Sequence, residues 1–194
     1  MKNFSTRPKD LADYVLIVRP DEEVSLKVME ERKHFLEVYG CQNSKGKPFI
    51  GIYKFLAWES MEDTIVRWLQ RISKDRDRFT ITLNNYSGIP SHKIVLRVQD
   101  IAFLKELTAR IQAIAPYTKE KACPEDRSFN YPYLTLAKKL PANVYEDAIK
   151  VYAKKEFHAS FEVNELILLR KTSEGDAGKE IAVFRLQSTY TMFK

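Results

Sequence analysis

One short stretch, NYPYLTLAKKL at residues 130–140, combines residue types that bind phosphates and sugars. Its alternation is typical of a strand, with Tyr133 and Thr135 on one face and leucines on the other. Two hydroxyls at this spacing can hydrogen-bond a phosphate or a ribose. The stretch therefore predicts a binding site, and the alternative is a half-exposed sheet face without chemistry.

A second stretch repeats this pattern earlier in the chain. PFIGIYK, from Pro48, resembles PYLTLAK, from Pro132, at an offset of 84 residues. At the same offset MEDTIVRW, from Met61, falls on YEDAIKVY, from Tyr145, so a strand and the helix after it recur in order. We predict two duplicated β-α-β-α-β units, the alternative being chance similarity between amphipathic elements.

Hydrophobic periodicity supplies the elements that these units need. Runs rich in β-branched and aromatic residues predict strands, and apolar residues at helical spacing predict the helices between them. The predicted strands are 14–19, 49–56, 79–86, 93–98, 131–138, 157–170 and 180–186, and the predicted helices are 21–39, 60–73, 100–113 and 143–154.

The duplicated units predict an α+β fold with a single bilobal domain over residues 1–194. The repeat places the lobes at about 12–90 and 91–187. Each lobe is expected to carry a small, mostly antiparallel sheet with its helices outside. The two sheets are expected to flank a central cleft, the usual place for a ligand.

A pseudo-twofold axis between such lobes would bring strands 48–56 and 131–138 together. Phe49 and Gly51 would then face Tyr133 and Thr135 across the cleft, whereas Lys54 would point to the opposite face of its strand. Aromatic rings stack on bases, and hydroxyls bind phosphate or ribose. The predicted ligand-binding residues are Phe49, Tyr53, Tyr131, Tyr133 and Thr135.

In this layout residues 12–187 resemble the two-histidine phosphoesterase superfamily, which includes 2'-5' RNA ligases and cyclic nucleotide phosphodiesterases. In that superfamily each lobe contributes a His-x-Thr or His-x-Ser motif between apolar residues. Phe49 and Tyr133 hold the histidine places here, and Gly51 holds one hydroxyl place. Thr135 alone fits the motif, so the resemblance implies the fold and a degenerate catalytic set.

The replacements change the chemistry that the resemblance implies. In the active family one imidazole removes a proton and the other protonates the leaving oxygen, since histidine titrates near neutral pH. The Phe49 ring transfers no proton, and a phenol, which ionises near about pH 10, is a poor proton shuttle. The histidines of this chain, His34, His92 and His158, are expected on the surface or in turns.

Three hypotheses about function stay open. The first is a protein that binds a nucleotide, or an RNA with a phosphate or cyclic phosphate end, without acid–base catalysis. The second is an active, divergent cyclic phosphodiesterase or RNA ligase that uses Tyr133 and Thr135. The third is a non-catalytic protein-interaction module. No cofactor or metal is expected, since Cys41 and Cys123 lack metal-site spacing.

Charge and hydropathy bound these hypotheses further. The net charge of +6 favours an anionic ligand, the alternative being a solvated basic surface. No apolar run reaches the ~20 residues of a membrane-spanning helix. The N-terminal sequence MKNFSTRPKDLADY lacks the apolar segment of a signal peptide. We therefore expect a cytoplasmic protein without a membrane partner, and the sequence predicts no oligomeric state.

Overall fold

The computed structural model describes residues 8, 10–40, 44, 46–89, 92–99, 101–117, 131–171 and 178–188. Cys41 and Cys123, whose spacing predicts no metal site, lie outside these ranges. Within them, none of the helices combines the length and the apolar character that crossing a bilayer requires.

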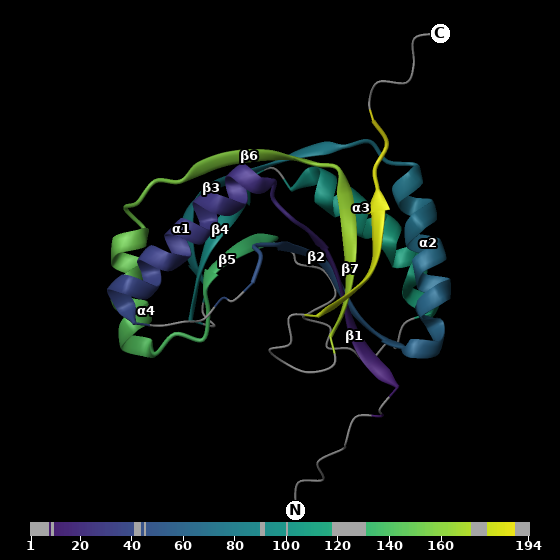
Figure 1. The fold of residues 1–194 in the computed structure, drawn as a ribbon, viewed down its shortest axis with the longest axis horizontal. Coiled ribbons are helices and arrows are strands. Elements are labelled where there is room, and N and C mark those ends of the chain that lie inside the picture. Colours follow the sequence, from purple (N-terminus) through teal and green to yellow (C-terminus); the bar gives the residue numbers. More distant parts are fainter. Residues whose placement is uncertain are drawn as a thin grey trace, which may run out of the picture.

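The described residues form a mixed arrangement of strands and helices (Figure 1). The strands are β1 (Leu11–Val18), β2 (Ile50–Trp58), β3 (Phe79–Ile89), β4 (Lys93–Gln99), β5 (Tyr133–Ala137), β6 (His158–Val163), β7 (Glu165–Lys171) and β8 (Lys179–Arg185). The α-helices are α1 (Glu22–Tyr39), α2 (Glu62–Lys74), α3 (Ala102–Ile111) and α4 (Ala142–Tyr152), and the 3-10 helices are η1 (Glu59–Met61) and η2 (Gln112–Tyr117).

All eight strands belong to one curled sheet with the order β6-β3-β4-β5-β2-β1-β7-β8 (Figure 1). The α+β class is confirmed, but the prediction of two separate sheets is wrong. Every strand pair is antiparallel, and β2 and β5 are joined by a single registered pair, Ile50 with Leu134. The sheet thus consists of two four-stranded halves, which we call the first half (β2, β1, β7, β8) and the second half (β5, β4, β3, β6).

One predicted strand is in fact two. The run 157–170 divides at Asn164 into β6, which pairs with β3, and β7, which pairs with β1. Hydrophobicity does not mark this point, because β7 is buried on both faces and reads as a continuous apolar run. The backbone of Leu186 donates to the Asn164 carbonyl over 2.9 Å. The chain therefore passes from one half of the sheet to the other at Asn164.

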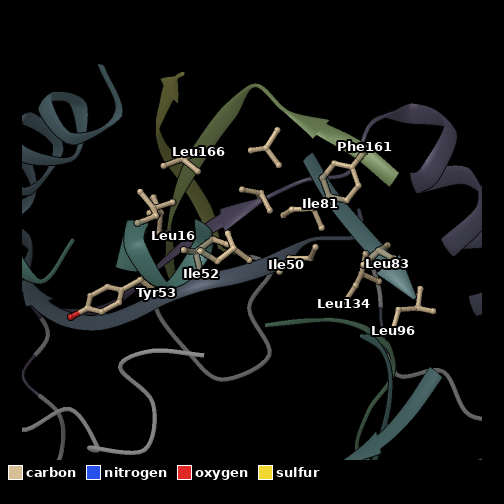
Figure 2. Close-up of a cluster of buried hydrophobic side chains, with 14 of the residues drawn as sticks. Leu16, Ile50, Ile52, Tyr53, Ile81, Leu83, Leu96, Leu134, Phe161 and Leu166 are labelled. Carbon is tan, nitrogen blue, oxygen red and sulfur yellow. The ribbon is translucent and has the colours of Figure 1, made fainter. Parts of the chain in front are cut away.

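The four described α-helices bury their apolar residues against the same face of the sheet. α1 and α4 lie against the second half, and α2 and α3 against the first (Figure 1). One continuous core contains side chains from both halves, and Figure 2 shows part of it. α1 begins where the Asp21 carboxylate accepts from the Val24 backbone, and ends at Gly40, which has a φ of 65°.

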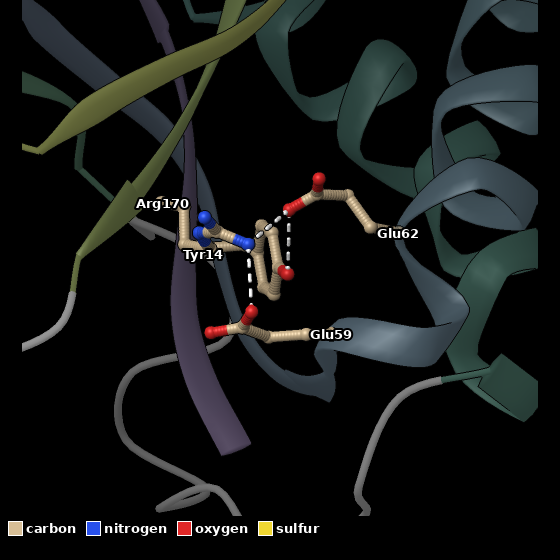
Figure 3. A network of polar contacts seen from close by, with 4 residues as sticks. All are labelled: Tyr14, Glu59, Glu62 and Arg170. Atoms are coloured by element: carbon tan, nitrogen blue, oxygen red, sulfur yellow. Dashed lines mark hydrogen bonds and ion pairs between the residues drawn. The ribbon is translucent and has the colours of Figure 1, made fainter. Parts of the chain in front are cut away.

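A polar network anchors the start of α2 on this helix-covered face (Figure 3). The Tyr14 hydroxyl donates to Glu62 over 2.9 Å, and the Arg170 guanidinium donates to Glu62 and Glu59 over 3.1 and 3.0 Å. Burial, followed by the bond to Glu62, raises the pKa of Tyr14 far above its usual value. The tyrosine therefore stays neutral, and the network serves to fix α2 on β1 and β7.

Gly88 on β3 is predicted to be essential for the close packing of α4. An added Cβ would meet the Tyr145 hydroxyl, and would lie 2.9 Å from Ile149 Cδ1. Gly88→Ala should therefore lower the free energy of unfolding by about 1–3 kcal/mol, the usual cost of overpacking. Urea unfolding checks this, and Tyr145→Phe in the same chain should restore part of the loss. An unchanged stability would contradict the close approach.

Candidate functional site

The single pair between β2 and β5 brings the four central predicted positions together. Ile50 and Leu134 are fully buried in the core beneath the helices. Side chains alternate along a strand, so their neighbours project from the opposite face. Those neighbours are Phe49, Gly51, Tyr133 and Thr135. We call this helix-free face the site face.

A β-bulge follows the central residues in each of the two strands. In β2 the register with β1 skips Ile52, and in β5 the register with β4 skips Leu136. The two skipped residues are 84 positions apart, which is the offset between the two similar stretches of sequence. A bulge adds one residue to one strand and reverses the alternation beyond it.

The bulge in β2 corrects two predictions. Tyr53 is only 4% exposed and belongs to the buried cluster of the core (Figure 2). Its ring centre lies 5.9 Å from that of Phe55, so it does not share a face with Phe49. Lys54 lies across from Val15, whose side chain packs in the cluster that Phe49 contacts. Lys54 is therefore on the site face, although uninterrupted alternation predicts the opposite. The other predicted residue, Tyr131, is 80% exposed just before β5.

Each aromatic side chain beside the Ile50–Leu134 pair has a lysine as neighbour. The ammonium of Lys171, from β7, lies 5.6 Å from the centre of the Phe49 ring. The ammonium of Lys93, from β4, donates to the Tyr133 hydroxyl over 3.4 Å and lies 5.8 Å from that ring's centre. Both rings are half-buried. Cations close to aromatic rings favour a ligand that is both flat and anionic.

An arginine also accompanies each half. Arg97 of β4 is in register with Tyr133, and its Nε donates to the Asn84 carbonyl over 3.4 Å. Arg19 follows the last residue of β1 and donates to the Glu180 carboxylate over 3.0 Å. The site face thus has a positive centre, and its first half also carries acidic side chains.

The two halves of the site face differ in polarity. On the first half, Phe49 packs against the buried side chains of Val15, Ile17, Ile167 and Leu169. On the second half the equivalent surface carries hydroxyls, including Thr82 and Ser160, which are hydrogen-bonded to each other over 2.9 Å, and Thr135. The first half is therefore closely packed and apolar around the half-buried Phe49 ring, whereas the second half presents polar groups.

Arg32 of α1 holds the strand that carries Tyr133 and Thr135. Its guanidinium donates to the Thr135 carbonyl over 2.7 Å and to the Gly46 carbonyl over 3.0 Å. Burial lowers the pKa of Arg32 to about 10, so it is still charged at neutral pH. Because β2 and β5 share one registered pair, this cation supplies a donor that a longer strand pairing would otherwise provide.

Two of the three histidines, His92 and His158, lie on or next to strands of the second half. His92 stacks on Tyr145 at 5.2 Å and its Nδ1 lies 3.2 Å from the Leu140 carbonyl, so it contacts the start of α4. His158 is exposed on β6, in register with Asn84, and β4 and β3 separate β6 from β5. His34 is exposed on α1. Among the described residues, neither His92 nor His158 makes a hydrogen bond or ring contact with Phe49 or Tyr133.

Sequence reasoning missed the cations of the site face. Lys93 and Arg97 flank Val95 at alternating positions of one strand, so their common face was readable from the spacing. Lys171 ends β7, which the sequence pattern merges with β6 into one predicted strand. The bulge at Ile52 reverses the side-chain alternation before Lys54, so the sequence pattern places Lys54 on the wrong face. Neither of these two follows from periodicity.

Solved structures share this fold over nearly their whole length. A structure titled "Crystal structure of phosphoesterase" has a TM-score of 0.67 at 16% identity and covers 93% of this chain and 99% of its own. E. coli LigT complexed with 3'-AMP has a TM-score of 0.65 at 14% identity, with 91% and 98% covered. Kluyveromyces marxianus Usb1 has a TM-score of 0.55 at 10% identity, with 92% and 99% covered. The fold is therefore that of the LigT-like phosphoesterases.

The family follows from the sequence match. The model of the 2'-5' RNA ligase superfamily matches residues 20–175, so the chain belongs to that superfamily. This confirms the superfamily resemblance. Comparison with curated protein sequences gives no match.

Replacing Arg32 tests its role in holding β5. Arg32→Gln removes a charged donor from two backbone carbonyls, and hydrogen bonds of this kind contribute about 1.5–3 kcal/mol each. We expect the free energy of unfolding to fall by at least about 1.5–3 kcal/mol, the contribution of one such bond, in a urea titration. Lys33→Gln is the control, since Lys33 is 78% exposed and its ion pair spans 3.9 Å, and it should change stability by under about 0.5 kcal/mol. Equal effects would contradict the role of Arg32.

Proposed function

We propose that the protein binds a nucleotide, or the phosphate-bearing end of an RNA, on the site face without the acid–base catalysis of its superfamily. The observation that carries the proposal is the Ile50–Leu134 pair, which sets Phe49 and Tyr133 on one face with a lysine beside each. The rings stack on a base, and the cations attract its phosphate.

Phe49 and Tyr133 stand where the superfamily carries its histidines, and Gly51 stands where it carries one hydroxyl. The repeat offset and the matching bulges at Ile52 and Leu136 support this assignment. General acid–base catalysis contributes about 10²–10⁴-fold per group. A site with neither imidazole therefore binds its ligand and releases it unchanged.

The relatives support a nucleotide as the ligand. E. coli LigT has been solved in complex with 3'-AMP, with NADP+ and with ATP. The site face of this chain offers the matching chemistry, with aromatic rings for a base and Lys93, Arg97 and Thr135 for phosphate and ribose.

Binding measurements on ring variants test the proposal. Tyr133→Ala and Phe49→Ala should each weaken binding of a short RNA about 5–150-fold, since a stacked base contributes about 1–3 kcal/mol. Tyr133→Phe keeps the ring and loses the hydroxyl, so it separates stacking from hydrogen bonding. Tyr39→Ala, at the end of α1 on the helix side, is the aromatic control and should leave affinity unchanged. Fluorescence anisotropy gives the dissociation constants.

Absence of binding to nucleotides and RNA would contradict the proposal and favour a protein-interaction module. Turnover of 2',3'-cyclic nucleotides that Thr135→Ala abolishes would instead support an active, divergent enzyme. Both are read from the same purified protein, by anisotropy and by chromatography of the products.

A repair experiment tests the assignment of the motif positions. Phe49→His with Tyr133→His restores two imidazoles to the face, and Gly51→Thr adds the second hydroxyl. We expect cyclic phosphodiesterase activity to appear in the double variant and to rise in the triple variant, because general acid and base are then both present. Folded variants, checked by circular dichroism, that stay inactive would contradict the assignment.

A further inference from the structure

The second half of the site face holds two cations, Lys93 and Arg97, for which the described residues supply no carboxylate partner. In the described part of the chain, no acidic side chain lies within ion-pair distance of Lys93 or Arg97. The first half differs, because Arg19 is paired with Glu180 at 3.0 Å and Asp13 of β1 is in register with Lys171 of β7. An incoming anion therefore meets the uncompensated positive charge of Lys93 and Arg97 on the second half, beside the junction with β2.

Hydroxyls accompany these two cations on adjacent strands. Arg97 is in register with Tyr133, and Val95, two residues before Arg97, is in register with Thr135. The ammonium of Lys93 reaches the Tyr133 hydroxyl over 3.4 Å. Arg97 is exposed and the other three polar side chains are half-buried, so a ligand can reach all four.

Such a set discriminates between phosphates by charge. A phosphomonoester carries about −1.5 to −2 at neutral pH and presents three terminal oxygens. A cyclic phosphate or a phosphodiester carries a single negative charge and presents two such oxygens. Two cations with two hydroxyls therefore match the monoester better, and Arg97 can contact two of its oxygens at once.

We propose that Lys93, Arg97, Tyr133 and Thr135 form a subsite for a phosphomonoester end, and that the protein prefers this dianion to a 2',3'-cyclic phosphate. The inference rests on the proposed function, since it names the class of ligand that the site face takes. The base of the ligand then lies toward the half-buried ring of Phe49. The site retains the product of cyclic phosphate hydrolysis rather than its substrate.

Three nucleotides that differ in phosphate charge test this preference. The full-length chain is titrated calorimetrically with adenosine 3'-monophosphate, its O-methyl phosphodiester and adenosine 2',3'-cyclic phosphate, at low salt and at a pH where the monoester is a dianion. We expect the monoester to bind about tenfold tighter than the other two. Inorganic phosphate is titrated as a fourth ligand, because it distinguishes a site that binds any phosphate anion from a site that binds a nucleotide.

Variants that each remove one positive charge test which residues cause the preference for the monoester. Lys93→Gln and Arg97→Gln should each reduce monoester affinity about 5- to 30-fold and bring the three affinities closer together. Lys150→Gln on α4, which removes the same charge from an exposed helix surface, should change none of them. Arg19→Gln should have a smaller effect than Arg97→Gln, because Arg19 already faces Glu180. Thermal unfolding confirms that the variants are folded.

The outcomes separate this inference from the function on which it rests. Equal affinity for the three nucleotides, or a preference that survives in the Lys93→Gln, Arg97→Gln double variant, overturns the dianion subsite and leaves nucleotide binding intact. Inorganic phosphate binding as tightly as the monoester contradicts the nucleotide part alone. Binding of none of the four ligands contradicts both.

Discussion

The site depends on one narrow contact, the pairing of Ile50 in β2 with Leu134 in β5. A backbone hydrogen bond contributes about 0.5–1.5 kcal/mol, whereas burying each of these side chains contributes about 1.5–3 kcal/mol. The two halves of the sheet are therefore joined here mainly by the core beneath the strands (Figure 2). Arg32, which donates to the Thr135 carbonyl, reinforces the same contact from α1.

The matching bulges decide what else reaches the site. Without the bulge at Ile52, the side chain of Tyr53 would share a face with Phe49, and Lys54 would be on the helix side. With it, an aromatic residue fills the core and a cation joins the site face. A one-residue irregularity thus exchanges an apolar group for a charge.

Electrostatics then make the two halves unequal despite their similar geometry. Glu180 and Asp13 accompany the cations of the first half, whereas Lys93 and Arg97 of the second half have no such partner in the described residues. The first half is apolar around Phe49, and the second carries hydroxyls. The charge and polarity of the site face are therefore asymmetric about the junction of β2 and β5.

Local patterns in the sequence predicted the α+β class, most helices and strands, and the common face of Phe49, Gly51, Tyr133 and Thr135, because alternation and helical spacing are local properties. The tertiary structure alone decided that the sheet is single, that residues 157–170 form two strands divided at Asn164, and that Lys54 rather than Tyr53 lies on the site face. Strand partners, bulges and the positions of Lys93 and Lys171 beside the rings depend on contacts between distant segments. Periodicity carries no information about those contacts.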